Sequence, residues 1–232
     1  MITVVCFKWF DPQGRWNRSF TYGADHVARL RSMVFRNLSQ EHEFVCATDN
    51  PSDLPPGVRA VPINERLWQA RHRYAKLDIF RPDASAIYGE RILAFDLDCV
   101  ITGPLDPLLD GVGEFKIWGD TAKGTPYNSS LVYLEAGKRA RVYDDFDPIA
   151  SPREAKASGY IGTDQAWIGL TLGKNEDRWT EVDGVLSYKR DCLRRRNGRL
   201  PNFGKVVFFH GEVDPSMAEC QRRSPWIERH WK

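Results

Sequence analysis

The stretch RILAFDLDCVITGPLDPL, residues 91–108, places two aspartates one residue apart at the end of an apolar segment. The chain then turns at Gly103-Pro104. Two chemistries use this arrangement. In one, Asp96 is a nucleophile that accepts a phosphoryl group. In the other, the carboxylates of Asp96 and Asp98 hold a divalent metal ion against a diphosphate. The segments on either side of this stretch help to distinguish the two.

Length and composition set the broad class. The chain has 232 residues, enough to bury the core of one large domain, and its formal net charge of +2 does not indicate a polyanionic partner for the molecule as a whole. Its five cysteines show no CxxC spacing, which favours reduced thiols. We expect a cytoplasmic protein, because no apolar run reaches membrane-spanning length and Lys8 and Asp11 interrupt the apolar N-terminus.

Strand and helix signals alternate along the first half of the chain, which predicts βαβ units and a mainly parallel sheet. Apolar runs predict strands over 2–7, 43–50, 58–63 and 91–95, and helical spacing predicts helices over 24–38 and around 74–80. Further strands are predicted over 114–118, 129–134 and 206–211, with helices near 136–145 and from 163 onward. The predicted fold class is α/β, a single domain over 1–232 with a mixed, mainly parallel central sheet flanked by helices.

The phosphoryl-transfer interpretation has one motif in its favour. The segment resembles that of the haloacid-dehalogenase-like phosphatases, since Val100 occupies the last position of their DxDx[TV] pattern. In that fold, however, the strand with the nucleophile normally comes first, whereas three predicted strands precede Asp96 here. The metal interpretation is therefore favoured, and a phosphatase using Asp96 and Asp98 stays as an alternative.

Several further segments support the metal interpretation. They are VVCFKW (4–9), FDLD (95–98), PLDPLLD (104–110), YNSSLVYL (127–134), GTDQAWI (162–168) and FFHG (208–211). In this order they resemble the GT-A glycosyltransferases, nucleotide-sugar-dependent enzymes that include the glycogenin-like and galactosyltransferase-like groups. The resemblance implies a GT-A domain with a nucleotide-binding half (1–100) and a sugar and acceptor half (101–232). It also implies transfer of a hexose from a nucleotide-diphosphate sugar, UDP as the first choice, to a hydroxyl group.

The same resemblance implies a metal site. Asp96, Asp98 and His210 are the expected ligands of Mn²⁺ or Mg²⁺, and a nitrogen ligand suits Mn²⁺ better. Burying two carboxylates beside apolar neighbours would be costly without a cation. The residue types agree with this role, although an aspartate pair in a loop or a histidine after a strand also occurs without any metal.

Sugar and diphosphate contacts are implied for a larger set. The expected catalytic residues are Asp164 and Gln165, at the start of a helix that Thr163 is predicted to cap. The expected donor-binding residues are Phe7, Lys8, Lys76, Asp96, Asn128, Ser129 and Lys189. Glycogenin-like enzymes have a Lys-Pro pair that clamps the diphosphate where this chain has Asp214-Pro215. Lys189 or an arginine of 194–199 is therefore expected to supply that positive charge.

Two basic runs near the C-terminus allow two interpretations. RRRNGRL (194–200) and QRRSPWIERHWK (221–232) could form a surface for an anionic glycan or nucleic-acid acceptor. They could equally be an exposed loop and a tail whose Trp226 and Trp231 pack on the domain. A binding module without enzymatic activity, sensing nucleotides or nucleic acid, is a third alternative for the function. The sequence leaves the acceptor open among glycans, small molecules and nucleic acid.

Overall fold

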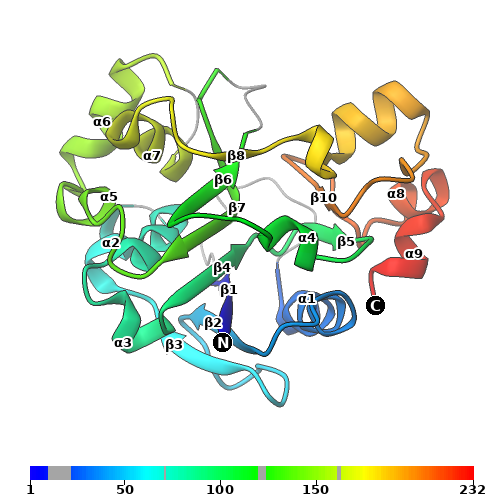
Figure 1. Cartoon of the computed structure of the whole chain (residues 1–232), viewed down its shortest axis with the longest axis horizontal. Helices are drawn as coiled ribbons and strands as arrows, with labels where there is room; N and C mark the ends of the chain where they lie inside the picture. The colour runs from blue at the N-terminus through cyan, green and yellow to red at the C-terminus, as the bar shows by residue number, and fades with distance from the viewer. Residues whose placement is uncertain (10–21, 71, 120–123, 161–162) are drawn as a thin grey trace.

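The computed structural model describes residues 1–9, 22–70, 72–119, 124–160 and 163–232, which excludes Gly162 of the GTDQAWI segment. Figure 1 shows a central sheet with helices on both sides. Helices α1, α8 and α9 lie on one side of the sheet, and α2, α3, α5, α6 and α7 lie on the other. In the part of the chain described, no helix is long and apolar enough to cross a membrane.

The main sheet has seven strands within the described residues, in the order β3-β2-β1-β4-β7-β6-β8. They are β1 (Ile2–Lys8), β2 (His42–Thr48), β3 (Arg59–Pro62), β4 (Arg91–Phe95), β6 (Phe115–Trp118), β7 (Asn128–Glu135) and β8 (Arg178–Trp179). Only β7 runs antiparallel to its neighbours. The mixed, mainly parallel sheet predicted from the sequence is confirmed.

A second, smaller sheet was not predicted. It contains β5 (Cys99–Ile101), β9 (Val185–Ser187) and β10 (Val206–Phe208), in the order β5-β10-β9. Strand β10 is antiparallel to β5 and parallel to β9. These strands have three residues each, too few for a periodic pattern. Only the β10 segment was recognised as a strand, from the longer apolar run that contains it.

The helices cover both faces of the sheet. The α-helices are α1 (Ala24–Asn37), α2 (Glu65–Ala70), α3 (Ala84–Tyr88), α4 (Asp106–Leu109), α5 (Arg141–Asp144), α6 (Ala150–Ala157), α7 (Asp164–Leu172), α8 (Ala218–Arg223) and α9 (Trp226–His230). Segments η1 (His72–Phe80) and η2 (Glu181–Asp183) are 3₁₀ helices, and η3 (Tyr188–Arg194) is a π-helix. The helix predicted near 136–145 is reduced to α5, because Arg139 adopts a left-handed conformation with φ of 60°.

Strand β1 explains how the core is divided. Val4 and Cys6 face one apolar cluster, which also contains the buried side of α1, whereas Val5 and Phe7 face a second cluster with residues of η1 and α7. When both faces of a strand pack against apolar layers, nearly every residue along the strand is apolar, as in the run 2–7. The five cysteines are buried with free thiols.

The C-terminal tail packs on the domain. Trp226 and Ile227 of α9, together with Trp231, are buried in the cluster that contains α1. Arg29 of α1 donates a hydrogen bond of 2.8 Å to the carbonyl of Trp231 and lies over its ring. The tryptophans of the second basic run are therefore part of the core, and the run's arginines remain at the surface.

Candidate active site

The two aspartates lie where the chain passes from the large sheet to the small one. Strand β4 ends at Phe95, and the backbone amide of Asp96 still donates to the carbonyl of Ser130 in β7 at 2.9 Å. Strand β5 begins at Cys99 in the small sheet. Asp98 is buried, and Asp96 is partly exposed. Both carboxylates thus occupy the carboxyl end of a central parallel strand, where open α/β sheets bind ligands.

Lys76 joins two of the predicted site residues. Its ammonium forms ion pairs with the carboxylates of Asp96 and Asp164, the second at 3.8 Å. Burial alone would lower the pKa of Lys76, but the two carboxylates outweigh that effect and raise the pKa above its ordinary value. Lys76 comes from η1, Asp96 from the end of β4 and Asp164 from the start of α7. Three distant segments therefore meet at one charged cluster.

Hydroxyl groups fix the orientation of these carboxylates. Ser130 donates to Asp96 at 2.7 Å, and Ser129 donates to Oδ2 of Asp164. Thr163 donates to Oδ1 of Asp164 at 2.7 Å and does not cap α7 through its side chain, so the predicted capping hydrogen bond is wrong. Each Asp164 oxygen therefore has a hydroxyl donor, and this carboxylate is held in one position.

Asp98 is buried close to two other carboxylates, those of Asp96 and Asp214. Burial, together with the negative charge of Asp96, raises the pKa of Asp98 to about 7. Lys76 and the Tyr22 hydroxyl, which donates to Asp98 at 3.0 Å, act in the opposite direction. The carboxylate of Asp214 adds to the rise. The raised pKa means that the anionic form of Asp98 is less favourable here than in water.

The small sheet brings His210 and Lys189 to the same end as Asp98. Cys99 pairs with Phe208, and Phe208 pairs with Ser187, so the residues just before β5 and just after β9 and β10 share one edge. The amide of Phe209 donates to the carbonyl of Asp98 at 2.7 Å.

Two contacts orient the residues at this edge. The His210 ring stacks on Trp118, with centroids 5.2 Å apart. The Lys189 ammonium lies so close to Gly211 that a Cβ there would be 3.1 Å from it.

Asp214, which stands where glycogenin-like enzymes have lysine, is fully buried. Its carboxylate lies 3.3 Å from Nε2 of His26 and accepts a hydrogen bond of 2.8 Å from the amide of Ser216. It therefore adds negative charge behind Asp98 instead of a clamp for a diphosphate. Tyr22 and His26 were not predicted as part of the site, because they lie far from it in sequence and belong to no motif.

The remaining predicted donor residues occupy different positions. Phe7 lies beneath the cluster and, with Lys76, Asp96 and Ser129, lines a cavity of about 10 Å³, room for one water molecule. Lys8 pairs with Asp53 at 2.7 Å and donates to the carbonyl of Asn50 at 3.1 Å, so its charge is directed toward the loop after β2.

Asn128 and Gln165 lie at the starts of the elements that flank the cluster. The Oδ1 atom of Asn128 accepts a hydrogen bond of 2.9 Å from the amide of Ser130 at the start of β7. Gln165 is half-buried in the first turn of α7.

The arrangement fits a divalent cation that arrives with a diphosphate. Among the residues described, no three His, Cys, Asp or Glu side chains are arranged to enclose a metal ion by themselves. Protein sites for Mg²⁺ commonly contribute only one or two carboxylates and leave the other positions to water and substrate phosphates. Asp96 and Asp98 provide two carboxylates of the required hard-oxygen type, and burial together with the charge of Asp96 raises the pKa of Asp98. The residues present therefore fit such an ion.

No protein-family model and no curated protein matches the sequence. Solved structures do match the fold. The galactosyltransferase LgtC, solved with donor and acceptor sugar analogues, has a TM-score of 0.61 and 12% identity over 99% of this chain and 96% of its own. The bifunctional glycosyltransferase WbbM, in its apo form, has a TM-score of 0.60 and 14% identity over 98% of this chain and 50% of its own. The glycosyltransferase GlyE of Streptococcus pneumoniae TIGR4 has a TM-score of 0.58 and 13% identity over 94% and 57%.

These neighbours are GT-A glycosyltransferases, and the chain has their fold along nearly its whole length. The predicted single GT-A fold is confirmed. At 12–14% identity, this likeness is one of fold.

Proposed function

We propose that the protein is a metal-dependent glycosyltransferase that moves a hexose from a nucleotide-diphosphate sugar, UDP as the first donor to test, to a hydroxyl acceptor. The single observation that supports this most is the convergence of Lys76, Asp96, Asp98 and Asp164 at the carboxyl end of β4, in a fold shared with glycosyltransferases. In this proposal residues 1–100 bind the nucleotide, and 101–232 complete the site for the sugar and acceptor.

Asp96 and Asp98 would hold Mn²⁺ or Mg²⁺. His210, at the adjoining end of β10, would become a third ligand only after its ring moves from its present position against Trp118. The ion, when bound, would neutralise negative charge on the departing diphosphate. Asp98 would bind as the anion, the form that a nearby cation favours. Lys76, held between Asp96 and Asp164, would keep both carboxylates in place and could turn toward a diphosphate oxygen.

Asp164 and Gln165 would face the donor sugar. Asp164 is buried, and its carboxylate is fixed by Ser129, Thr163 and Lys76. A carboxylate held in this way can accept a hydrogen bond from a sugar hydroxyl without first being reoriented. Gln165 follows in the first turn of α7 and would contribute an amide beside it.

Lys189 is the proposed source of positive charge for the leaving diphosphate. Its ammonium lies against Gly211, next to His210, and Asp214 cannot provide such a charge. Phe7, Lys8, Asn128 and Ser129 remain proposed donor contacts at the ends of β1 and β7. Lys8 would have to exchange its pairing with Asp53 for a phosphate oxygen to act directly.

The first experiment is calorimetric titration of UDP into the purified protein, with Mn²⁺ and again with excess EDTA. We expect binding only when the metal is present. Equal binding in both conditions would contradict the metal role, and no binding in either would remove UDP as the donor nucleotide. A panel of UDP-sugars, followed by release of UDP in the absence of an acceptor, then identifies the sugar.

The role of Asp98 is tested by Asp98→Asn, with Asp110→Asn as the matched control at an exposed aspartate. We expect Asp98→Asn to lower UDP-sugar turnover at least about 100-fold while the circular dichroism spectrum is unchanged. Asp110→Asn should retain wild-type turnover. Survival of activity in Asp98→Asn would show that this carboxylate does not bind the metal.

A further inference from the structure

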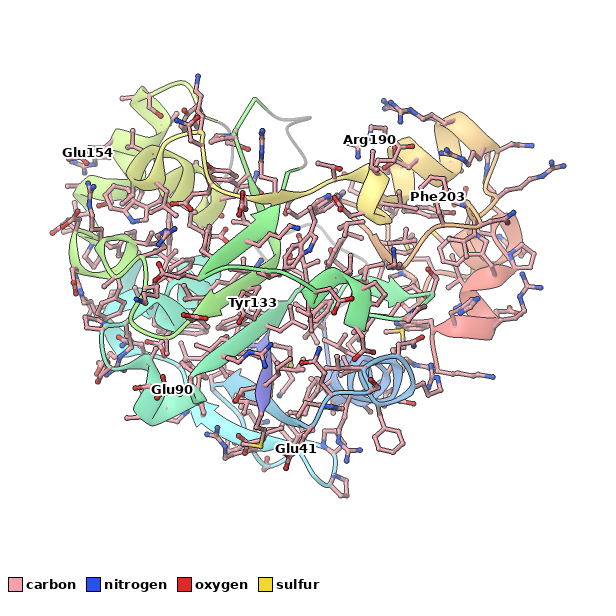
Figure 2. All side chains as sticks on the ribbon, viewed as in Figure 1. Glu41, Glu90, Tyr133, Glu154, Arg190 and Phe203 are labelled. Carbon is pink, nitrogen blue, oxygen red and sulfur yellow. The ribbon has the colours of Figure 1, made fainter. Side chains whose placement is uncertain are left out.

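The two basic runs of the C-terminal third meet around one cavity. The loop 197–204 and helices α8 and α9 line an open cavity of about 640 Å³. Phe203, labelled in Figure 2, marks this loop beside the C-terminal helices. The lining residues are Thr102, Asn197, Gly198, Arg199, Leu200 and Pro201, then Asn202, Gly204, Arg223, Pro225, Trp226 and Arg229. None of them is acidic. The cavity therefore has a strongly positive lining.

Its arginines have no partner within the described chain. Arg199, Arg223 and Arg229 are exposed, and none forms a hydrogen bond or ion pair through its guanidinium with a described residue. By contrast, Arg195 and Arg196, in the same run, pair with Glu181 at 2.6 and 3.4 Å. Within the first basic run, Arg195 and Arg196 are therefore paired with an acidic side chain, whereas Arg199, which lines the cavity, is not paired with any described one.

The wall of the cavity is held in place. The carbonyl of Gly198 accepts hydrogen bonds of 2.8 Å from both the indole of Trp226 and the hydroxyl of Ser224. Gly198 has φ of 85°, and a Cβ at this position would clash with the carbonyl oxygen of Arg223. The loop therefore lies directly on α8 and α9. A cavity formed before binding requires little further ordering of the chain when a ligand enters.

The cavity is separate from the candidate active site. Thr102 follows β5 and Gly204 precedes β10, at the end of the small sheet opposite Asp98 and His210. Three strand residues at about 3.3 Å each place roughly 10 Å of sheet between the two ends. A ligand in this cavity would therefore not occupy the site of the donor diphosphate, and its binding does not depend on the function proposed above.

We propose that this cavity binds a phosphate-bearing ligand of the size of a sugar phosphate. Guanidinium groups offer pairs of donors that match the oxygens of a phosphate, and the side chains of Asn197 and Asn202 add further polar groups. The volume lies in the range of small-ligand sites. A hollow of this volume with three arginines around it suits a compact anionic ligand. A nucleic-acid strand would follow a longer track of charge and stacked aromatic rings.

The test uses glucose 6-phosphate as the probe and glucose as the uncharged control. Both are titrated by calorimetry into the full chain, once in EDTA and once with Mn²⁺ and excess UDP. Equal binding in the two conditions separates this cavity from the donor site. We expect one glucose 6-phosphate per chain and no binding of glucose. The double variant Arg199→Ala/Arg223→Ala should weaken binding at least about tenfold, corresponding to 1.4 kcal/mol.

The matched control is Arg222→Ala, an exposed arginine on α8 that does not line the cavity. It should change the affinity less than about twofold. A sedimentation arm with vesicles of phosphatidic acid or of phosphatidylcholine shows whether a lipid headgroup can be the source of the phosphate. Loss of phosphatidic acid binding in the double variant alone would support the same cavity with a lipid ligand.

Two results would overturn the proposal. One is absence of binding by glucose 6-phosphate and by phosphatidic acid vesicles. The other is an equal effect of the double variant and of Arg222→Ala, which would indicate attraction to the surface as a whole. Circular dichroism and the urea midpoint of each variant confirm that a loss of binding is not a loss of fold.

Discussion

Lys76 in the candidate active site and Arg223 in the basic cavity are both cations, but they differ in burial and in pairing. The side chain of Lys76 is 15% exposed and lies between two carboxylates, whereas Arg223 is exposed and unpaired within the described residues. A buried charge requires a partner, while an exposed one is solvated by water. The first charge is therefore part of how the protein folds, and the second remains available for a ligand.

Replacing Lys76 with methionine should have the largest effect on stability. Lys76→Met keeps the length of the side chain but leaves Asp96 and Asp164 without their shared cation. We expect the free energy of unfolding at pH 7, measured with urea, to fall by about 3 kcal/mol, as for other broken buried pairs. Lys138→Met is the control, since Lys138 forms an exposed pair with Glu114. Its urea midpoint should match that of the wild type, and equal losses in both variants would contradict the distinction.

Substitution of Gly198 should have the second largest effect, because it connects stability to the cavity. Gly198→Ala combines a left-handed backbone with a clash against the carbonyl of Arg223. Gly111→Ala is the matched control, with φ of 66° and no atom within 4 Å of an added Cβ. We expect Gly111→Ala to cost about 1 kcal/mol and Gly198→Ala about 2 kcal/mol or more, measured by urea unfolding.

Only Gly198→Ala should also weaken binding of glucose 6-phosphate, because only that glycine shapes the cavity. If the two alanine variants unfold alike and bind the probe alike, the contact between the loop and α8 does not define the cavity.

The long elements could be predicted from the sequence, and the short ones could not. Strand β1 and helix α1 have seven and fourteen residues, enough for the patterns of a buried strand and an amphipathic helix to emerge. Strands β5 and β9 have three residues each, and both exist because they pair with β10. Strand β10 comes more than a hundred residues after β5 in the sequence. Local patterns do not contain that information. The small sheet, which brings His210 to Asp98, was therefore missing from the prediction.

The candidate site was predictable to a similar degree. Asp96, Asp98 and Asp164 stand at the ends of predicted elements, where charged residues commonly line a binding site. Lys76 forms ion pairs with Asp96 and Asp164. Tyr22, which donates to Asp98, belongs to no motif, so only the fold could identify it. The position of Lys8 at the end of β1 predicts a contact with a donor phosphate. In the structure its ammonium forms an ion pair with Asp53, a partner that no local sequence pattern indicates.

An ion pair whose two side chains are both partly exposed shows how much pairing contributes to stability when burial is small. Glu43 and Arg59 form a two-point pair between β2 and β3, with side chains 34% and 41% exposed. The hydrogen bond from Arg59 lowers the pKa of Glu43 below its ordinary value of 4.5. We expect Glu43→Gln to lower the unfolding free energy at pH 7 by only about 0.5 kcal/mol.

The pH dependence of this pair has a definite sign. A carboxyl group with a lowered pKa in the folded state binds fewer protons than in the unfolded chain, so its stabilisation is present above pH 4.5. It is lost as the pH falls through the folded-state pKa. Urea unfolding at pH 7 and at acid pH should therefore show the difference between Glu43→Gln and the wild type disappearing in acid. A difference of the same size at both pH values would contradict the role of the charge.

Arg223→Ala should have the smallest effect on stability, and its sign should depend on the ligand. Without a partner in the described chain, Arg223 contributes no attraction, and its removal lowers the repulsion from Arg199 and Arg229. The unfolding free energy of the ligand-free variant should equal or slightly exceed that of the wild type, most clearly at low salt. Saturating glucose 6-phosphate should reverse the order, because a ligand stabilises a protein according to its affinity. Thermal unfolding with and without the probe measures both. A ligand-free loss as large as that of Lys76→Met would mean that Arg223 serves the fold, and the contrast between the two cations would fail.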